Sequence, residues 1–143
     1  MSIPVALRNL DAAVGERGSA AYVLTVTERG TPHVVHAEIL RDAAGLMAVV
    51  GESTARNAGS RPHVTVLYPS RRPEDYSLIV DVVATVVSTP DGVRLRLAPS
   101  RAVLHRPAPA PDPAASPCGS DCVPLAIRST GLGERGSFGE GRV

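Results

Sequence analysis

The residues of this chain best suited to chemistry lie in one short segment, residues 51–61. Ser53, Thr54 and Arg56 follow Gly51 closely, and the apolar residues 46–50 precede it. This pattern predicts a strand that ends at the glycine and a short polar helix that begins after it. The first N–H groups of a helix lack intrahelical partners and carry partial positive charge, so hydroxyls and a guanidinium beside them suit a phosphate. The other interpretation is an ordinary helix capped by Ser53 with nothing bound, and the residues alone leave both open.

The same segment also allows a weaker hypothesis, in which Ser53 is the nucleophile of a serine hydrolase. Residues 51–55 differ by one residue from the G-x-S-x-G pattern of strand-to-helix turns in hydrolases. Those turns lie on parallel sheets far larger than any expected here, and nothing in the sequence places His63 or His105 at Ser53.

The remaining metal-binding, redox and nucleotide-binding patterns are weak. His33 and His36 are three apart in a predicted strand, so their side chains point to opposite faces and cannot easily share one ion. Cys118 and Cys122 supply two of the four ligands of a structural zinc site, which favours incidental thiols, with a redox pair as the alternative. Residues 131–136 match G-x-G-x-x-G without the strand and helix that give the motif its meaning. We therefore expect no metal site.

Two charged features allow more than one interpretation. Arg71 and Arg72 lie in the charged loop 69–75, where they could clamp an anionic substrate or simply be solvated. Asp81 interrupts an apolar run and should share a strand face with Ile79 and Val83. A carboxylate in that place lies at an edge, or is paired when it is buried.

Composition indicates one domain with an aliphatic core. The chain has 143 residues, of which 43% are hydrophobic and only 3% aromatic, and valine is abundant, which favours strands. The formal net charge of +1 gives no reason to expect nucleic acid or an anionic membrane as a partner. Because no segment approaches the roughly 20 apolar residues of a membrane span, we expect a soluble cytoplasmic protein.

The spacing of apolar runs predicts a mainly β fold with few helices. Six strands are expected at residues 21–28, 33–40, 46–50, 63–68, 76–88 and 93–97, and Pro99 should bend or end the last. A first helix is expected from Ser2, with an apolar face formed by Ile3, Leu7, Leu10 and Val14, and a second follows the third strand. The links are too short for parallel crossovers, so the strands form a small antiparallel barrel whose edges are closed or covered by a dimer.

The composition changes after residue 106. Residues 107–143 are rich in proline and glycine and cannot bury enough apolar surface to offset the entropy of ordering them. We therefore divide the chain into a domain of residues 1–106 and a tail of residues 107–143, largely disordered or draped over a partner.

The order of the segments resembles that of the pyridoxamine 5′-phosphate oxidase-like split-barrel family. The resemblance rests on residues 22–27, a turn with Gly30 and Pro32, and residues 33–36, 53–57, 61–68 and 76–86. It covers residues 19–103. It implies a six-stranded split barrel that forms a homodimer, with FMN in a groove at the subunit interface.

The resemblance also implies which residues hold the cofactor. The phosphate would be held after the third strand by Gly51, Ser53, Thr54, Arg56 and Asn57, and the ring and ribityl chain would be lined by His36, Ala37, Glu38, Val49 and Val50. Related members bind the deazaflavin coenzyme or heme instead. A lysine that many relatives carry before the Arg-Asn pair is missing, and the tail lacks a recognisable substrate-binding segment, so vitamin B6 oxidation is not expected. The sequence thus predicts an FMN-dependent oxidoreductase acting on an unknown small molecule, or a non-catalytic flavin, deazaflavin or heme carrier.

Overall fold

A computed structural model describes residues 1–107, which belong to one compact unit, Met1–Pro109. Cys118, Cys122, the glycine pattern at residues 131–136 and almost all of the predicted tail lie outside the described residues. None of the helices in the described part is long and apolar enough to cross a membrane.

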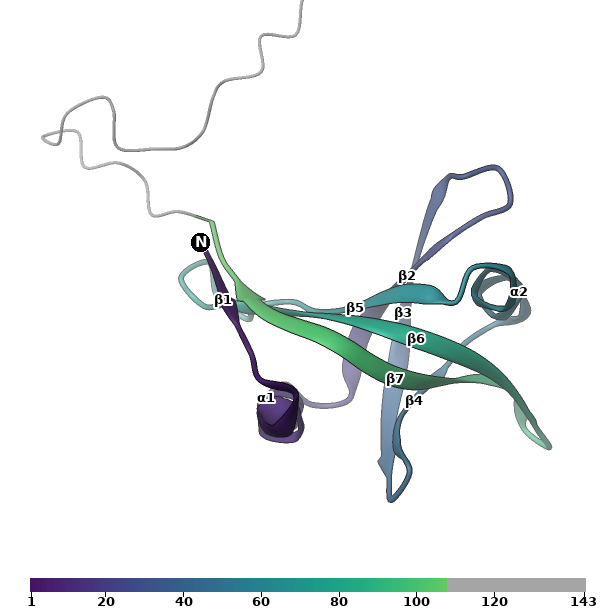
Figure 1. Ribbon diagram of the computed structural model, residues 1–143, viewed down its shortest axis with the longest axis horizontal. Coiled ribbons are helices and arrows are strands. Elements are labelled where there is room, and N and C mark those ends of the chain that lie inside the picture. Colours follow the sequence, from purple (N-terminus) through teal and green to yellow (C-terminus); the bar gives the residue numbers. More distant parts are fainter. Residues whose placement is uncertain (108–143) are drawn as a thin grey trace, which may run out of the picture. The chain divides into compact units, whose positions relative to one another are not determined.

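Six antiparallel strands form a closed barrel, which confirms the fold predicted from the sequence (Figure 1). The neighbouring strands pair as hairpins, and the barrel closes where β2 pairs with β5 and β4 pairs with β7. The strands are β2 (Ala20–Val26), β3 (Pro32–Asp42), β4 (Gly45–Val49), β5 (His63–Tyr68), β6 (Ser77–Thr89) and β7 (Gly92–His105). Closure leaves these six strands without the exposed edges at which sheets aggregate.

The interior follows from the alternation of side chains along each strand. In β5, Val64, Val66 and Tyr68 are buried while their neighbours face outward, and β6 continues the pattern from Leu78 to Ala84. Alternate residues of a strand point to opposite faces, so each strand supplies one inward row. The core that results consists mainly of valine, leucine and alanine, as the composition predicts.

The last strand continues through Pro99, where the sequence predicts a bend or an end. The register between β6 and β7 shifts at Asp81 and Val82, and Ser100 is the additional residue on β7. Its hydroxyl donates a hydrogen bond of 3.0 Å to the carbonyl oxygen of Asp81. A bulge tolerates a residue that lacks an N–H group, so the strand bends at Pro99 without ending.

The expected helix at the N-terminus is wrong in its first half. Residues Ser2–Pro4 form a short strand, β1, which pairs with β7, and the helical part begins only with η1 (Leu7–Asn9) and α1 (Leu10–Gly15). The β-branched residue and the proline at positions 3 and 4 suit an edge strand, and pairing with β7 decides between the two. Leu10 and Val14 are buried as predicted.

Helix α2 (Glu52–Ser60) connects β4 to β5 at the predicted place. It ends at Arg61, whose N–H group donates to the carbonyl of Asn57, and Pro62 prevents continuation. Its inward face consists of small or polar residues, Thr54, Ala55, Asn57 and Ala58, which let the helix lie close to the barrel. In Figure 1, α2 lies on the side of the barrel away from α1.

Candidate functional site

The N-terminus of α2 lacks a side-chain cap. Gly51 is the N-cap residue, with extended backbone and no capping hydrogen bond, so the interpretation of Ser53 as the N-cap is wrong. The N–H group of Ala55 makes the first intrahelical bond, 3.1 Å long, to the carbonyl of Gly51. The N–H groups of residues 52–54 therefore have no carbonyl partner within the helix. Space above Gly51 is open, with nothing within 4 Å of the place where a Cβ atom would lie.

Ser53 and Arg56 are the exposed polar residues of the first helical turns that suit an anion. They are three positions apart, so their side chains lie on the same face of α2. Glu52, also exposed, adds a negative charge to the first turn. A phosphate would thus be held by Arg56, the Ser53 hydroxyl and N–H groups, with little excess positive charge.

Thr54 and Asn57, which the resemblance also assigns to the phosphate, are buried against the barrel. Thr54 Oγ1 lies 3.4 Å from His33 Nε2, and Asn57 Nδ2 donates to Thr25 Oγ1 at 3.2 Å. Thr25 in turn lies 3.5 Å from the His33 carbonyl oxygen. This polar network fixes α2 to β2 and β3, so both residues position the helix, and their contact with a cofactor stays a prediction.

Sequence reasoning missed the part that His33 and Thr25 play in this network. The signal was present in the spacing, because Thr54, Ala55, Asn57 and Ala58 form a stripe at helical period. Such a stripe indicates a face that packs on another element, and a polar residue in it needs a partner on the strand beneath.

The predicted strand residues are divided between the two faces of the barrel wall. His36 and Glu38 point outward from β3, and Ala37 points into the core. Val49 pairs with Glu38 on the neighbouring strand and is 38% exposed, and Val50 is half-buried. The His36 ring meets the Tyr22 ring edge to face, with centroids 5.4 Å apart. The structure therefore places His36, Glu38 and Val49 on the outer face of the wall.

A groove of about 410 Å³ lies between α2 and the β2–β3 turn. Arg56 and Asn57 line it from the helix, and Arg29 brings a second guanidinium from the turn. Arg56 thus lines this groove and also shares the exposed face of the first helical turns with Ser53.

The other candidate chemistries find no matching geometry. Within residues 1–107 the Ser53 hydroxyl has no hydrogen bond to a histidine or a carboxylate, and no three His, Cys, Asp or Glu side chains gather as a metal site. Asp81 lies on the outer face with Ile79 and Val83, half-buried and paired: Thr65 donates to it at 3.0 Å and Arg101 lies 3.3 Å away. This confirms the face predicted for Asp81, and of the two alternatives left open by the sequence it shows the paired one.

The residues at α2 fit the phosphate end of a nucleotide cofactor. The donor set consists of unpartnered N–H groups, a hydroxyl and a guanidinium, which are the groups that phosphate sites at helix N-termini use. The outer face of β3 and β4 continues from this point with an exposed valine and an imidazole, which suit an apolar ring system.

Solved structures define the class of fold. A putative pyridoxamine 5′-phosphate oxidase from Listeria innocua matches with a TM-score of 0.57 and 17% identity, over 69% of this chain and 98% of that one. HutZ, the heme storage protein from Vibrio cholerae, matches with a TM-score of 0.53 and 18% identity, over 66% and 92%. An FAD-binding protein from Mycobacterium smegmatis matches with a TM-score of 0.52 and 14% identity, over 74% and 100%. The fold is that of the pyridoxamine 5′-phosphate oxidase-like split barrels, as the resemblance implies.

Sequence relatives define the family. An uncharacterized protein of Mycobacterium bovis and one of Mycobacterium tuberculosis are each 35% identical to this chain over 121 residues, which cover 75% of the chain and 85% of the relative. The chain belongs to the same family as these two mycobacterial proteins. No model of a known protein family matches the sequence.

Proposed function

We propose that this protein binds FMN, with the phosphate at the N-terminus of α2 and the ring system on the outer face of β3 and β4. The observation that carries the proposal is the uncapped start of α2, with Ser53 and Arg56 exposed beside it. Support comes from the similar structures, whose names include a putative pyridoxamine 5′-phosphate oxidase and an FAD-binding protein.

The chain's own residues would bind and orient the cofactor. Arg56 and Ser53 would hold the phosphate together with the N–H groups, while Val49 and His36 would lie along the ribityl chain and ring. The bound flavin would supply two-electron transfer chemistry to a small-molecule substrate that the residues do not identify. The protein would then be an oxidoreductase.

We also propose a homodimer that covers the exposed apolar side chains of the barrel wall. Val34 is 52% exposed, and Tyr22 and Val49 are large apolar residues exposed on the neighbouring strands β2 and β4. A second copy of the chain would remove this surface from water and enclose the cofactor between the two subunits. Light scattering should give the mass of a dimer for the wild-type protein, and Val34→Asp should lower the measured mass toward that of the monomer. A monomeric wild-type protein would contradict the proposed dimer.

The cofactor is tested by an absorption spectrum of the purified protein and by titration of the apoprotein with FMN. Arg56→Ala should weaken FMN binding by about 10- to 100-fold, the effect of losing a charge-assisted hydrogen bond. Arg8→Ala is the matched control, because Arg8 is an exposed arginine of η1, which directly precedes α1, and its loss changes the net charge equally. Equal affinity in the two variants would exclude the site at α2.

A carrier without catalysis is the second candidate. It is favoured by the similarity to a heme storage protein and by the exposed imidazole of His36, which could ligate heme iron. A heme band in the spectrum that is lost in His36→Ala would support a heme carrier. An absorption band shifted from that of oxidised FMN would indicate the deazaflavin coenzyme. Reduction of bound flavin by a nicotinamide donor would instead support the enzyme.

A further inference from the structure

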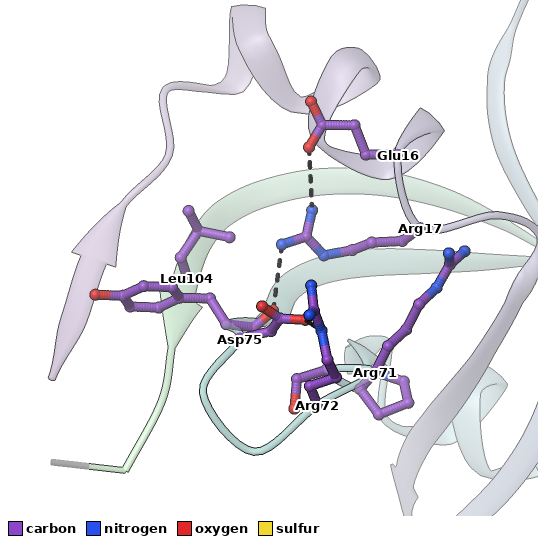
Figure 2. Close-up of a pocket in the computed structure, with 9 residues that line it drawn as sticks. Glu16, Arg17, Arg71, Arg72, Asp75 and Leu104 are labelled. Atoms are coloured by element: carbon purple, nitrogen blue, oxygen red, sulfur yellow. Dashed lines mark hydrogen bonds and ion pairs between the residues drawn. The ribbon is translucent and has the colours of Figure 1, made fainter. Parts of the chain in front are cut away.

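A second pocket, of about 380 Å³, lies next to the turn after α1 (Figure 2), and in Figure 1 α1 lies on the side of the barrel away from α2. Arg17 lines it from the turn after α1, Arg71 and Arg72 from the loop between β5 and β6, and Leu104 from the end of β7. The sequence indicated only the two loop arginines; the third comes from a distant segment.

Arg17 is a largely buried cation whose carboxylate partner is solvated. Its side chain is 18% exposed and is held in place by hydrogen bonds to the carbonyl oxygens of Ala13, at 2.7 Å, and Tyr76, at 3.4 Å. Its ion-pair partner, Glu16, lies 3.9 Å away and is 78% exposed. Burial of a charge is costly unless it is well paired, so a fixed guanidinium whose carboxylate partner is largely exposed to solvent suits an additional anion.

The two loop arginines add donors that the fold leaves available. Arg72 uses its Nε atom for Asp75, at 3.3 Å, and for Glu74, at 3.7 Å, and Figure 2 shows its side chain extending toward Arg17. Arg71 is exposed and makes no hydrogen bond or ion pair within residues 1–107. Three guanidinium groups therefore line the pocket together with the carboxylates of Glu16 and Asp75, and Glu74, outside the lining, also pairs with Arg72.

The other wall of the pocket is apolar. Leu104, Pro69 and the ring of Tyr76 line it, and the Arg106 guanidinium covers that ring at 4.6 Å from its centroid. A space of this size holds a small organic molecule, and ligand sites typically combine an apolar wall with a few polar groups that fix orientation.

We propose that this pocket binds a small organic anion, whose phosphate or carboxylate group contacts Arg17, Arg71 and Arg72 and whose apolar body lies on Leu104 and Tyr76. The site is separate from the proposed flavin site at α2 and does not depend on it. Its ligand is a substrate or effector with a single anionic group.

The test is calorimetric titration of the full chain at low salt with phenyl phosphate, benzoate and phenol. Saturable binding of one of the two anions but not of phenol is expected, and the tighter anion identifies the group that the site prefers. Arg71→Ala and Arg17→Gln should each weaken binding at least about 10-fold. Glu16→Gln should strengthen it about two- to five-fold, because it removes a carboxylate close to Arg17.

The controls separate this pocket from nonspecific charge and from the flavin site. Arg8→Ala removes the same charge elsewhere and should leave the affinity for the anion unchanged. Arg56→Ala should also leave it unchanged while weakening FMN, so the two proposals fail independently. Absence of saturable binding by either anion, or equal losses in Arg71→Ala and Arg8→Ala, would overturn the proposal.

Discussion

Replacement of Tyr68 by phenylalanine tests whether the buried Tyr68 hydroxyl lacks a hydrogen-bond partner in the folded barrel. Tyr68 ends β5 and is only 1% exposed, and within residues 1–107 its hydroxyl oxygen has no hydrogen-bond partner. A buried hydroxyl without a partner costs about 1–3 kcal/mol in mutational series. Phenylalanine keeps the ring and removes that group, so Tyr68→Phe should raise the free energy of unfolding by about 1 kcal/mol at neutral pH.

The same residue makes a second prediction at alkaline pH. Burial raises the pKa of Tyr68 to about 12, opposed by the charge of Arg41. In the unfolded chain the phenol ionises near pH 10, so the folded state binds the proton more tightly and stability falls as pH rises from 10 to 12. The wild-type protein should lose about 1.3 kcal/mol between pH 9 and pH 11 through this residue.

Urea unfolding at pH 7, 9 and 11 measures both effects. The sequence contains no lysine, so few groups other than Tyr68 titrate between pH 9 and pH 11. Tyr68→Phe should not show the part of the decrease in unfolding free energy at pH 11 that comes from Tyr68. Tyr22→Phe, at an exposed position, should still show it. A variant destabilised by more than about 1 kcal/mol at pH 7 would show that the hydroxyl is hydrogen-bonded, which refutes the reasoning.

Three further perturbations test the site and the wall of the barrel. Asn57→Ala should lower the free energy of unfolding by about 1–3 kcal/mol, measured in urea, because it removes the donor to the buried Thr25 hydroxyl oxygen. A hydrogen bond from Arg96 lowers the pKa of Asp42, so Asp42 stabilises the fold above its unfolded pKa and ceases to do so as pH falls through its folded pKa. The difference between wild type and Asp42→Asn in acid unfolding should therefore vanish at low pH. Ser53→Ala should leave any ester hydrolysis unaltered; a loss would revive the hydrolase hypothesis.

Much of the fold could be predicted because its signals are local. The strand observed as β5 was predicted at residues 63–68, as the fourth of six, since prolines bound an alternating run on both sides. The prediction for the start of the chain was wrong because Ile3 and Pro4 fit both a helix start and an edge strand. Only pairing with β7, far along the sequence, decides between the two. Local preference is a weak guide where a distant partner supplies the hydrogen bonds.

The helix that carries the candidate site was predicted, but the orientation of its side chains was not. The segment after Gly51 forms the expected helix, yet the sequence did not show that Thr54 and Asn57 would be buried and Ser53 and Arg56 exposed. The pocket lined by Arg17, Arg71 and Arg72 was harder still to predict from the sequence. Arg17 lies near the loop that carries Arg71 and Arg72 only in the folded barrel. Their spacing in the sequence therefore does not predict that they line one pocket.

The way β7 closes the barrel has a consequence for the kinetics of folding. The strand pairs with β1, β4 and β6, and its Arg96 binds Asp42 across 54 positions of the chain, while the backbone of Arg106 meets Met1 across 105. Hairpins such as β2–β3 can form early, but closure has to wait for contacts between distant segments, which impose a high entropic cost before they stabilise the fold. The domain should therefore fold slowly for its size, on a scale of about milliseconds to seconds. Until β7 is in place, the edges of β4 and β1 stay open to pairing with other chains.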